Sequence, residues 1–262
     1  IFSLVLVLSS IGLFLSKGLN LGIDFRGGIL IEARNSAGPA DISGLRRNLE
    51  SLGLGDISLQ GFGAETDILV RVQRQEGDEA AQIAAIEAIS SSLGETYDVR
   101  RTEFVGPTVG AELAEKGLLA VACALLAIMV YIWFRFEWQF GMGAVVALVH
   151  DAFLILGFYA VSGFDFGLTS IAAMLTVIGY SINDSVVIYD RIRENMRKYK
   201  KKPMEEILDL SINNTLSRTV ITALTTLLAA GALTWLGGEV IRGFSAALVF
   251  GVAVGTYSSI FV

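Results

Sequence analysis

Long apolar runs separated by short polar segments are the dominant pattern along this 262-residue chain. A helix needs about 20 predominantly apolar residues to cross a bilayer, and these runs approach that length. We therefore predict an α-helical integral membrane protein with six transmembrane helices, of which the first and last are expected to be truncated. The predicted helices are residues 1–16, 117–134, 141–163, 168–190, 218–238 and 243–262.

Residues 17–116 form the one long hydrophilic segment and are predicted to be a small separate domain. The β-α-β-β-α-β order of its predicted elements is typical of a ferredoxin-like α+β sandwich. Its second helix is expected to place Ile83, Ile86 and Ile89 on one side, and Gly27 with Gly28 is expected to let the backbone turn into the domain. The predicted elements are strand 29–34, helix 41–52, strands 56–62 and 67–73, helix 78–93 and strand 98–106.

Basic residues predict the orientation in the membrane. Eight Lys and Arg residues lie between Asp190 and Arg218, whereas the opposite short connections carry few. Because Lys and Arg concentrate in cytoplasmic loops, both termini are expected in the cytoplasm and residues 17–116 on the other side. Residues 191–217 are predicted to be a basic linker followed, from Pro203, by an amphipathic helix at the lipid surface.

The amino-acid composition limits the kinds of functional site that the chain could contain. The net charge of −6 comes from residues 17–116, which hold 10 basic and 16 acidic residues, so it indicates nothing about the membrane part. One cysteine, Cys123, and one histidine, His150, leave little material for a disulfide framework, a metal cluster or a Ser-His-Asp triad. An acidic domain with few aromatic residues shows no signature of nucleic-acid binding. We expect no enzyme activity and no cofactor.

Polar residues inside two predicted spans are the candidates for function. Asn183 and Asp184 lie within residues 168–190, and a carboxylate in hydrocarbon is costly unless it faces a bundle interior or a water-filled path. On the fifth span, a polar row predicts one helical face. If the two faces meet, Asp184 and Arg218 can approach and form a protonation switch. The row consists of Thr215, Arg218, Thr219, Thr222, Thr225 and Thr226.

Two purely structural interpretations of Asp184 and Arg218 remain open. Asp184 could simply lock two helices together, and Arg218 could extend to the lipid headgroups. In the third span, His150 and Asp151 are adjacent and should point about 100° apart, so we predict that they do not serve one site. Asp151 is the better functional candidate, because a lone helical histidine is more often a hydrogen-bonded packing residue.

Six motifs occur in a characteristic order: GIDFRGG, EFVGPTVGAEL, FRFEW, ALVHD, GYSINDSVVIYDRIREN and TLSRT. With six predicted spans they resemble the SecF family of bacterial protein-translocase subunits, in the resistance-nodulation-division (RND) superfamily. The resemblance implies half of an RND-type transporter in the inner membrane, with its α+β domain in the periplasm. It also implies that the proton-motive force assists late export steps and that the residues matching Asp184 and Arg218 carry protons.

The resemblance further implies partners. These are SecD, the SecYEG channel, the accessory YajC, SecA as the preceding motor, and unfolded exported proteins bound by the periplasmic domain. Since no second repeat occurs within the chain, the other half of a two-fold transporter should come from another polypeptide. A half-size RND-type efflux subunit for small molecules and a passive scaffold remain alternatives. Residues alone nominate Asp184, Arg218, Asn183, Thr222 and Asp151 for a proton pathway.

Overall fold

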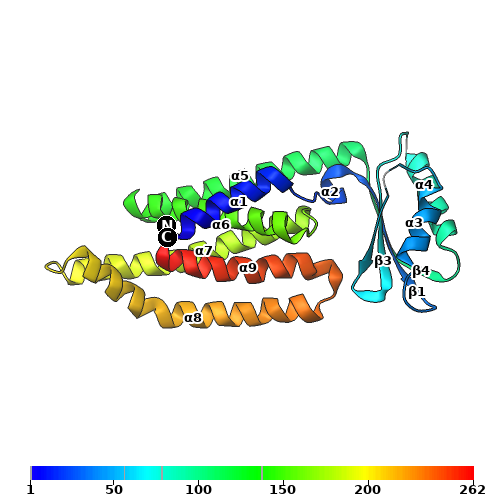
Figure 1. Cartoon of the computed structure of the whole chain (residues 1–262). Coiled ribbons are helices and arrows are strands. Elements are labelled where there is room, and N and C mark those ends of the chain that lie inside the picture. Colours follow the sequence, from blue (N-terminus) through cyan, green and yellow to red (C-terminus); the bar gives the residue numbers. More distant parts are fainter. Residues whose placement is uncertain (1, 56, 78, 137) are drawn as a thin grey trace. The chain divides into compact units, whose positions relative to one another are not determined.

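The chain is described here by a computed structural model covering residues 2–55, 57–77, 79–136 and 138–262, and it divides into two compact units (Figure 1). The helical unit comprises the residues up to Asn20 and those from Leu118 onward. The sheet unit comprises Leu21–Gly117. The division into a membrane-type bundle and a hydrophilic domain follows the change in hydropathy along the sequence.

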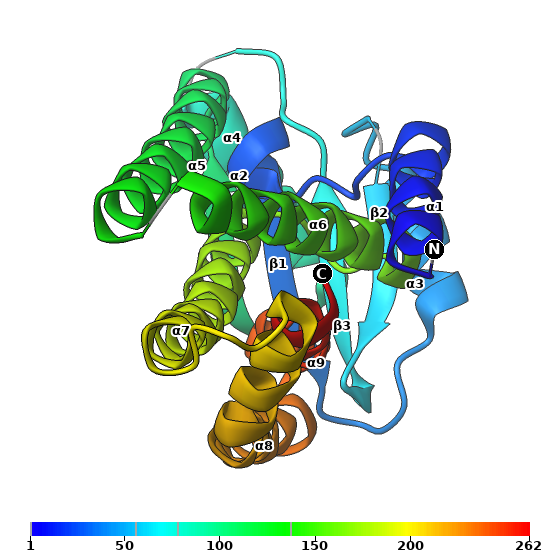
Figure 2. The ribbon, with the colours of Figure 1, turned by 90° about the vertical axis from the view of Figure 1, so that its left-hand side faces the viewer.

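Long helices make up the helical unit. Five helices in the described part of the chain are long and apolar enough to cross a membrane, while α1 has only 16 residues. In Figure 2, which views the helices close to end-on, α7, α8 and α9 lie together, and α6 lies between α1 and this group. The helices are α1 (Phe2–Lys17), α5 (Pro107–Arg135), α6 (Trp138–Ser162), α7 (Leu168–Lys198), α8 (Met204–Leu236) and α9 (Glu239–Phe261).

The helix boundaries differ from the predicted spans at three places. Helix α5 begins ten residues before the apolar run, and α7 continues through the basic segment to Lys198. The predicted surface helix and the fifth span are one helix, since α8 runs without a break from Met204 to Leu236. The reason is local: Pro203 precedes α8 at its N-cap, as predicted, and no proline or glycine interrupts the helix before Gly231.

The sheet unit contains a four-stranded antiparallel sheet in the order β2-β3-β1-β4. A hydrophobic core, made mainly of buried Ile, Leu and Val side chains, joins the sheet to α3 and α4. Asp41 accepts a hydrogen bond from the Gly44 amide and caps α3. The elements are the short helix α2 (Ile23–Arg26), β1 (Gly28–Asn35), α3 (Ile42–Glu50), β2 (Ile57–Phe62), β3 (Ala64–Val72), α4 (Glu79–Leu93) and β4 (Tyr97–Val105).

The two adjacent glycines at the start of β1 behave as predicted. Gly27 and Gly28 have φ angles of +71° and +127°, which L side chains rarely adopt. A Cβ atom on Gly28 would lie 2.7 Å from the carbonyl oxygen of Val72 in β3. Both the turn and the close approach of the backbones therefore require glycine here.

Two of the three isoleucines predicted on one side of α4, Ile86 and Ile89, pack in the core, whereas Ile83 does not. Ile83 is 51% exposed, whereas Ile89 is fully buried and Gln82 is 2% exposed. The Gln82 amide accepts from the Gln75 backbone N–H and donates to the Gln75 carbonyl, which satisfies its polar atoms in the core. The predicted spacing is thus correct for Ile86 and Ile89, while the hydrogen-bonded Gln82 is buried and Ile83 is exposed.

Candidate functional site

Asp184 of α7 is buried, at 5% exposure, and is held by hydroxyl groups of two other helices. Oδ1 accepts a hydrogen bond of 2.8 Å from Thr219 on α8, and Oδ2 accepts one of 2.9 Å from Ser259 on α9. Charge-assisted hydrogen bonds of this kind are stronger than neutral ones. The Asp184 carboxylate therefore joins α7, α8 and α9 at one point.

Arg218 does not pair with this carboxylate. Its side chain is exposed, although Thr219, the next residue on α8, is buried and reaches Asp184. No ion pair between Asp184 and Arg218 is found within the described segments. Because the crossing of α7 and α8 presents Thr219 to the carboxylate, Arg218 lies one step around the helix on its open side.

The remaining polar row on α8 mostly bonds to its own helix. The Thr222 hydroxyl donates to the carbonyl oxygens of Arg218 and Thr219, at 3.0 Å each, and Thr226 donates to Thr222. Asn183 on α7 is exposed rather than directed into the helical unit. The predicted row of hydroxyl groups lies on α8. Among the described residues of this row, Thr219 alone donates a hydrogen bond to another helix.

Asp151 of α6 forms a second buried polar cluster. It is fully buried, and its Oδ2 accepts hydrogen bonds from Ser181 on α7 at 2.5 Å and Ser258 on α9 at 2.8 Å. Its Oδ1 lies 2.9 Å from Nδ1 of His150, which is itself only 4% exposed. This carboxylate, like Asp184, is surrounded by hydroxyl donors from neighbouring helices.

The prediction that His150 and Asp151 do not serve one site is therefore wrong. Helix periodicity separates their Cα–Cβ directions by about 100°, but both side chains are long enough to turn toward each other within the same buried region. The Nδ1···Oδ1 contact makes them one unit. Spacing arguments fix where a side chain starts and leave its rotamer open.

Close packing of α7 and α9 brings the serines to both carboxylates. A Cβ atom on Gly251 of α9 would lie 2.3 Å from the Val177 side chain of α7, and one on Gly255 would lie 3.1 Å from Ser181. Two small residues four positions apart let helix backbones approach in this way. The glycine pair thus sets the distance at which hydroxyl groups of α9 reach acidic groups on α6 and α7.

Sequence reasoning missed three of these ligands. Ser181, Ser258 and Ser259 each bind one of the two carboxylates. The only signal in the sequence is a pair of adjacent serines, 258 and 259, within an otherwise apolar run. Hydroxyl groups are tolerated anywhere in a membrane helix when they bond to their own backbone, so this signal alone does not identify a ligand.

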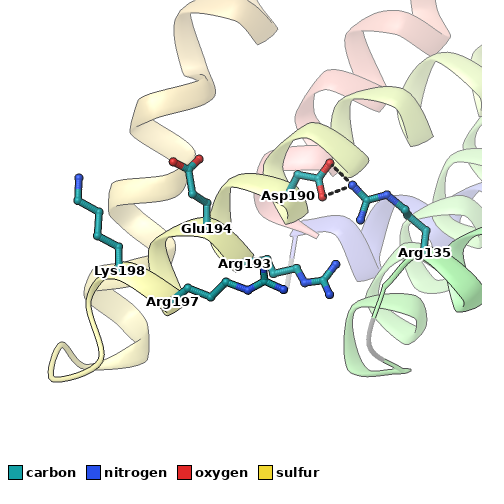
Figure 3. A pocket seen from close by; sticks show the side chains of 6 residues that line it. All are labelled: Arg135, Asp190, Arg193, Glu194, Arg197 and Lys198. Carbon is teal, nitrogen blue, oxygen red and sulfur yellow. Dashed lines mark hydrogen bonds and ion pairs between the residues drawn. The ribbon is translucent and has the colours of Figure 1, made fainter.

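A pocket of about 460 Å³ lies elsewhere, near the end of α7 (Figure 3). Arg135 binds Asp190 there with contacts of 2.7 and 2.8 Å to the two carboxylate oxygens. Neither buried carboxylate lines this pocket. Its lining residues are Arg135, Asp190, Arg193, Glu194, Arg197 and Lys198. Both members of its ion pair are well exposed, which makes it a solvated charge cluster separate from the buried site.

Apolar helices that bury two carboxylates, together with a small sheet unit, define a multi-pass membrane protein with polar sites inside its bundle. The family model "Protein export membrane protein SecD/SecF, C-terminal" matches residues 85–262, and the model "SecD/SecF GG Motif" matches residues 12–34. The chain belongs to the SecD/SecF family.

Curated relatives refine this assignment. Proteins named "Protein translocase subunit SecF" from Rickettsia akari and Rickettsia rickettsii are each 52% identical to the chain, over all of it and 85% of their own length. A crystal structure of SecDF from Thermus thermophilus, described as a translocon-associated membrane protein, has a TM-score of 0.86 and 39% identity. The match covers 99% of this chain and 36% of that one. The resemblance to the SecF family is confirmed.

Proposed function

We propose that this chain is the SecF-type subunit of a SecDF-like complex, which uses proton movement across the bacterial inner membrane to assist late, SecA-independent steps of protein export. Two comparisons support this: the relatives are named as SecF translocase subunits, and the chain matches 36% of a solved SecDF protein. The rest of such an assembly would come from a SecD-type subunit. It would work with the SecYEG translocon, YajC and, functionally, SecA.

The proposed topology follows from the sequence and from the helices of the bundle. We propose six spans with α1 as the first, both termini in the cytoplasm and a ferredoxin-like domain in the periplasm that contacts unfolded exported proteins. The β-α-β-β-α-β element order and the strand order β2-β3-β1-β4 support that domain type. Exposed leucine, valine and phenylalanine side chains along the helices would face lipid.

The observation that carries the mechanism is the Asp184 carboxylate bound by hydroxyl groups of α8 and α9. A proton on this group would remove the negative charge that holds Thr219 and Ser259, and the three helices could then shift. Arg218, exposed on α8, would act with Asp184 through a partner surface or water, and Asn183, Thr222 and Asp151 complete the proposed pathway. Protons are the coupling ion, and the subunit performs no enzymatic chemistry.

Export in cells lacking the native subunit tests this proposal. Asp184→Asn keeps the size of the side chain and should reduce proton-dependent export at least tenfold, while the complex still assembles with its SecD-type partner. Asp209→Asn, an exposed acidic position on the same helix as Thr219, is the matched control and should export normally. Undiminished export by Asp184→Asn would overturn the proton mechanism.

A passive scaffold makes a different prediction. If the subunit only stabilises a channel, Arg218→Met should retain export as long as the complex can be purified intact. We expect Arg218→Met to assemble and to lose export. A charged side chain within a membrane helix is energetically costly, and such residues usually belong to an ion pathway. Measuring assembly and export in the same cells separates the two interpretations.

A further inference from the structure

The mechanism above leaves one buried nitrogen without a function. His150 is 4% exposed, and its Nε2 atom has no hydrogen-bond partner among the residues that the structure describes. A neutral imidazole has one donor nitrogen and one acceptor nitrogen. With Nδ1 bonded to Asp151, Nε2 is either a donor or an acceptor that the surrounding protein leaves unpaired. Such a group is a candidate site for proton binding.

The neighbouring carboxylate is arranged to compensate that proton. Asp151 contacts Nδ1 of His150 through Oδ1, and its Oδ2 is held by Ser181 and Ser258. A proton bound at Nε2 would leave the Nδ1–H directed at the carboxylate, so the imidazolium charge would sit beside a negative group. Release of the proton from Nε2 returns the same neutral imidazole. The Nδ1···Oδ1 contact therefore makes the two side chains one buried unit.

Helix α9 connects this pair with Asp184. Ser258 donates to Asp151, and the next residue, Ser259, donates to Asp184 at 2.9 Å. Each serine also has an acceptor on its own helix: the Gly255 carbonyl lies 3.1 Å from Ser258, and the Thr256 carbonyl lies 3.0 Å from Ser259. When a carboxylate loses its negative charge, its serine can turn to this second acceptor. One helix therefore responds to both acidic groups.

We infer that His150 and Asp151 form a second proton-binding site, and that Ser258 and Ser259 of α9 link its protonation to that of Asp184. The biological use of this link rests on the proton-coupled function proposed above. Within one helical turn of the cluster, the other titratable side chains are Tyr257 on α9 and Tyr180 and Asp184 on α7. The facing part of α1 has none, and neither does this turn of α6.

Since His150 is the only histidine in the chain, ¹⁵N-histidine labelling reports on this site alone. The full chain, purified without a polyhistidine tag, would be placed in lipid bilayers and its imidazole nitrogens followed by solid-state NMR from about pH 5 to pH 9. We expect conversion from neutral imidazole, with a proton on Nδ1, to imidazolium. An imidazole that stays neutral over this range would overturn the proton-binding site.

Four variants test the link through α9. Asp184→Asn should move the midpoint of the His150 conversion by about one pH unit, as expected for interacting sites. In Ser258→Ala, the same Asp184→Asn change should have no effect. Ser245→Ala is the matched control, because Ser245 is a fully buried serine of α9 that donates only to carbonyls of its own helix. Asp151→Asn should change the imidazole tautomer in any background.

The outcomes separate this inference from the proposed function. An Asp184→Asn midpoint equal to that of the unmodified chain would overturn the link, even if export is lost. A titrating His150 together with normal export in Asp184→Asn would leave the second site standing and remove the proposed mechanism. A shift that persists in Ser258→Ala would assign the coupling to a route other than α9, which contradicts the inference.

Discussion

Acidic side chains are compensated in two different ways in the two units. In the sheet unit, Asp67 on β3 pairs with Arg34, its cross-strand neighbour on β1, through contacts of 2.6 and 2.7 Å. In the helical unit, Asp184 is bound by hydroxyl groups, and no cation contacts it among the recorded ion pairs of the described residues. The Asp67 side chain has a counter-charge and is 12% exposed, whereas Asp184 is 5% exposed and its side-chain hydrogen bonds in the described residues come from hydroxyl groups.

This difference indicates what each group is suited to do. An exposed ion pair adds little to stability, and its charges remain fixed near neutral pH. A buried carboxylate held only by hydroxyl donors can be neutralised by a proton without breaking an ion pair. Its hydroxyl ligands can then turn to carbonyls of their own helices, as the contacts of Ser259 show. The proposed proton coupling therefore places the change of charge in the helical unit and not at the Arg34–Asp67 pair of the sheet unit.

The largest expected effect comes from separating α7 and α9. Gly251→Leu would drive a side chain into Val177, whose Cγ2 lies 2.3 Å from the position of a Cβ. We expect a loss of about 3 kcal/mol in the free energy of unfolding, the upper end for overpacking. Unfolding in mixed micelles measures it. Gly179→Leu is the control, because no atom lies within 4 Å of its Cβ position. Equal losses in both variants would contradict the packing argument.

A smaller effect is expected from removing one hydroxyl ligand. Thr219→Val keeps the shape of the side chain but removes the donor to Asp184, which should cost about 2 kcal/mol of unfolding free energy for a hydrogen bond to a charged group. Thr226→Val, on the same helix, removes a hydroxyl that bonds only to the Thr222 carbonyl and should change stability by less than about 0.5 kcal/mol. If the two variants have equal stability, the hydroxyl does not stabilise the carboxylate.

The smallest effect concerns pH and the sheet unit. The hydrogen bond from Arg34 lowers the pKa of Asp67 below its usual value of about 4. Because this pKa is lower in the folded state, the stabilisation is present above about pH 4 and is lost as the pH falls through the folded value. Hydrogen exchange should show this loss of stability as weaker protection of the β1 and β3 amides at low pH.

Arg34→Gln should remove this part of the acid sensitivity. Arg101→Gln is the control, because Arg101 pairs with Glu103 on β4 and not with Asp67. An unchanged acid dependence of the β1 and β3 amides in Arg34→Gln would show that the pair has no energetic role.

The sequence predicted the elements better than their contacts. Hydropathy located the apolar helices, and alternation with turn residues located the strands, because these periodicities come from single elements. The contact between Asp184 and Thr219 depends on how α7 crosses α8, which no single-helix pattern contains. The predicted approach of Arg218 to Asp184 is not seen for this reason, since a rotation of one position presents Thr219 instead.

The second buried cluster shows the same limit. The charge of Asp151 identifies it as a candidate in the sequence. Its partners Ser181 on α7 and Ser258 on α9 lie 30 and 107 residues away from it along the chain. Hydroxyl groups in apolar runs carry no pattern that distinguishes a ligand from a self-bonded side chain. Only the packing of α6, α7 and α9 shows which serines bind the carboxylate.

Proton flux through vesicles containing the chain and its SecD-type partner tests the central claim most directly. A proton gradient would be imposed on vesicles that contain the unmodified complex, Asp184→Asn or the exposed control Asp209→Asn at equal protein content, and its rate of dissipation would be measured. We predict that Asp184→Asn lowers the protein-dependent flux at least tenfold and that Asp209→Asn leaves it unchanged. Equal flux in all three preparations would show that the buried carboxylate of α7 does not carry the coupling proton.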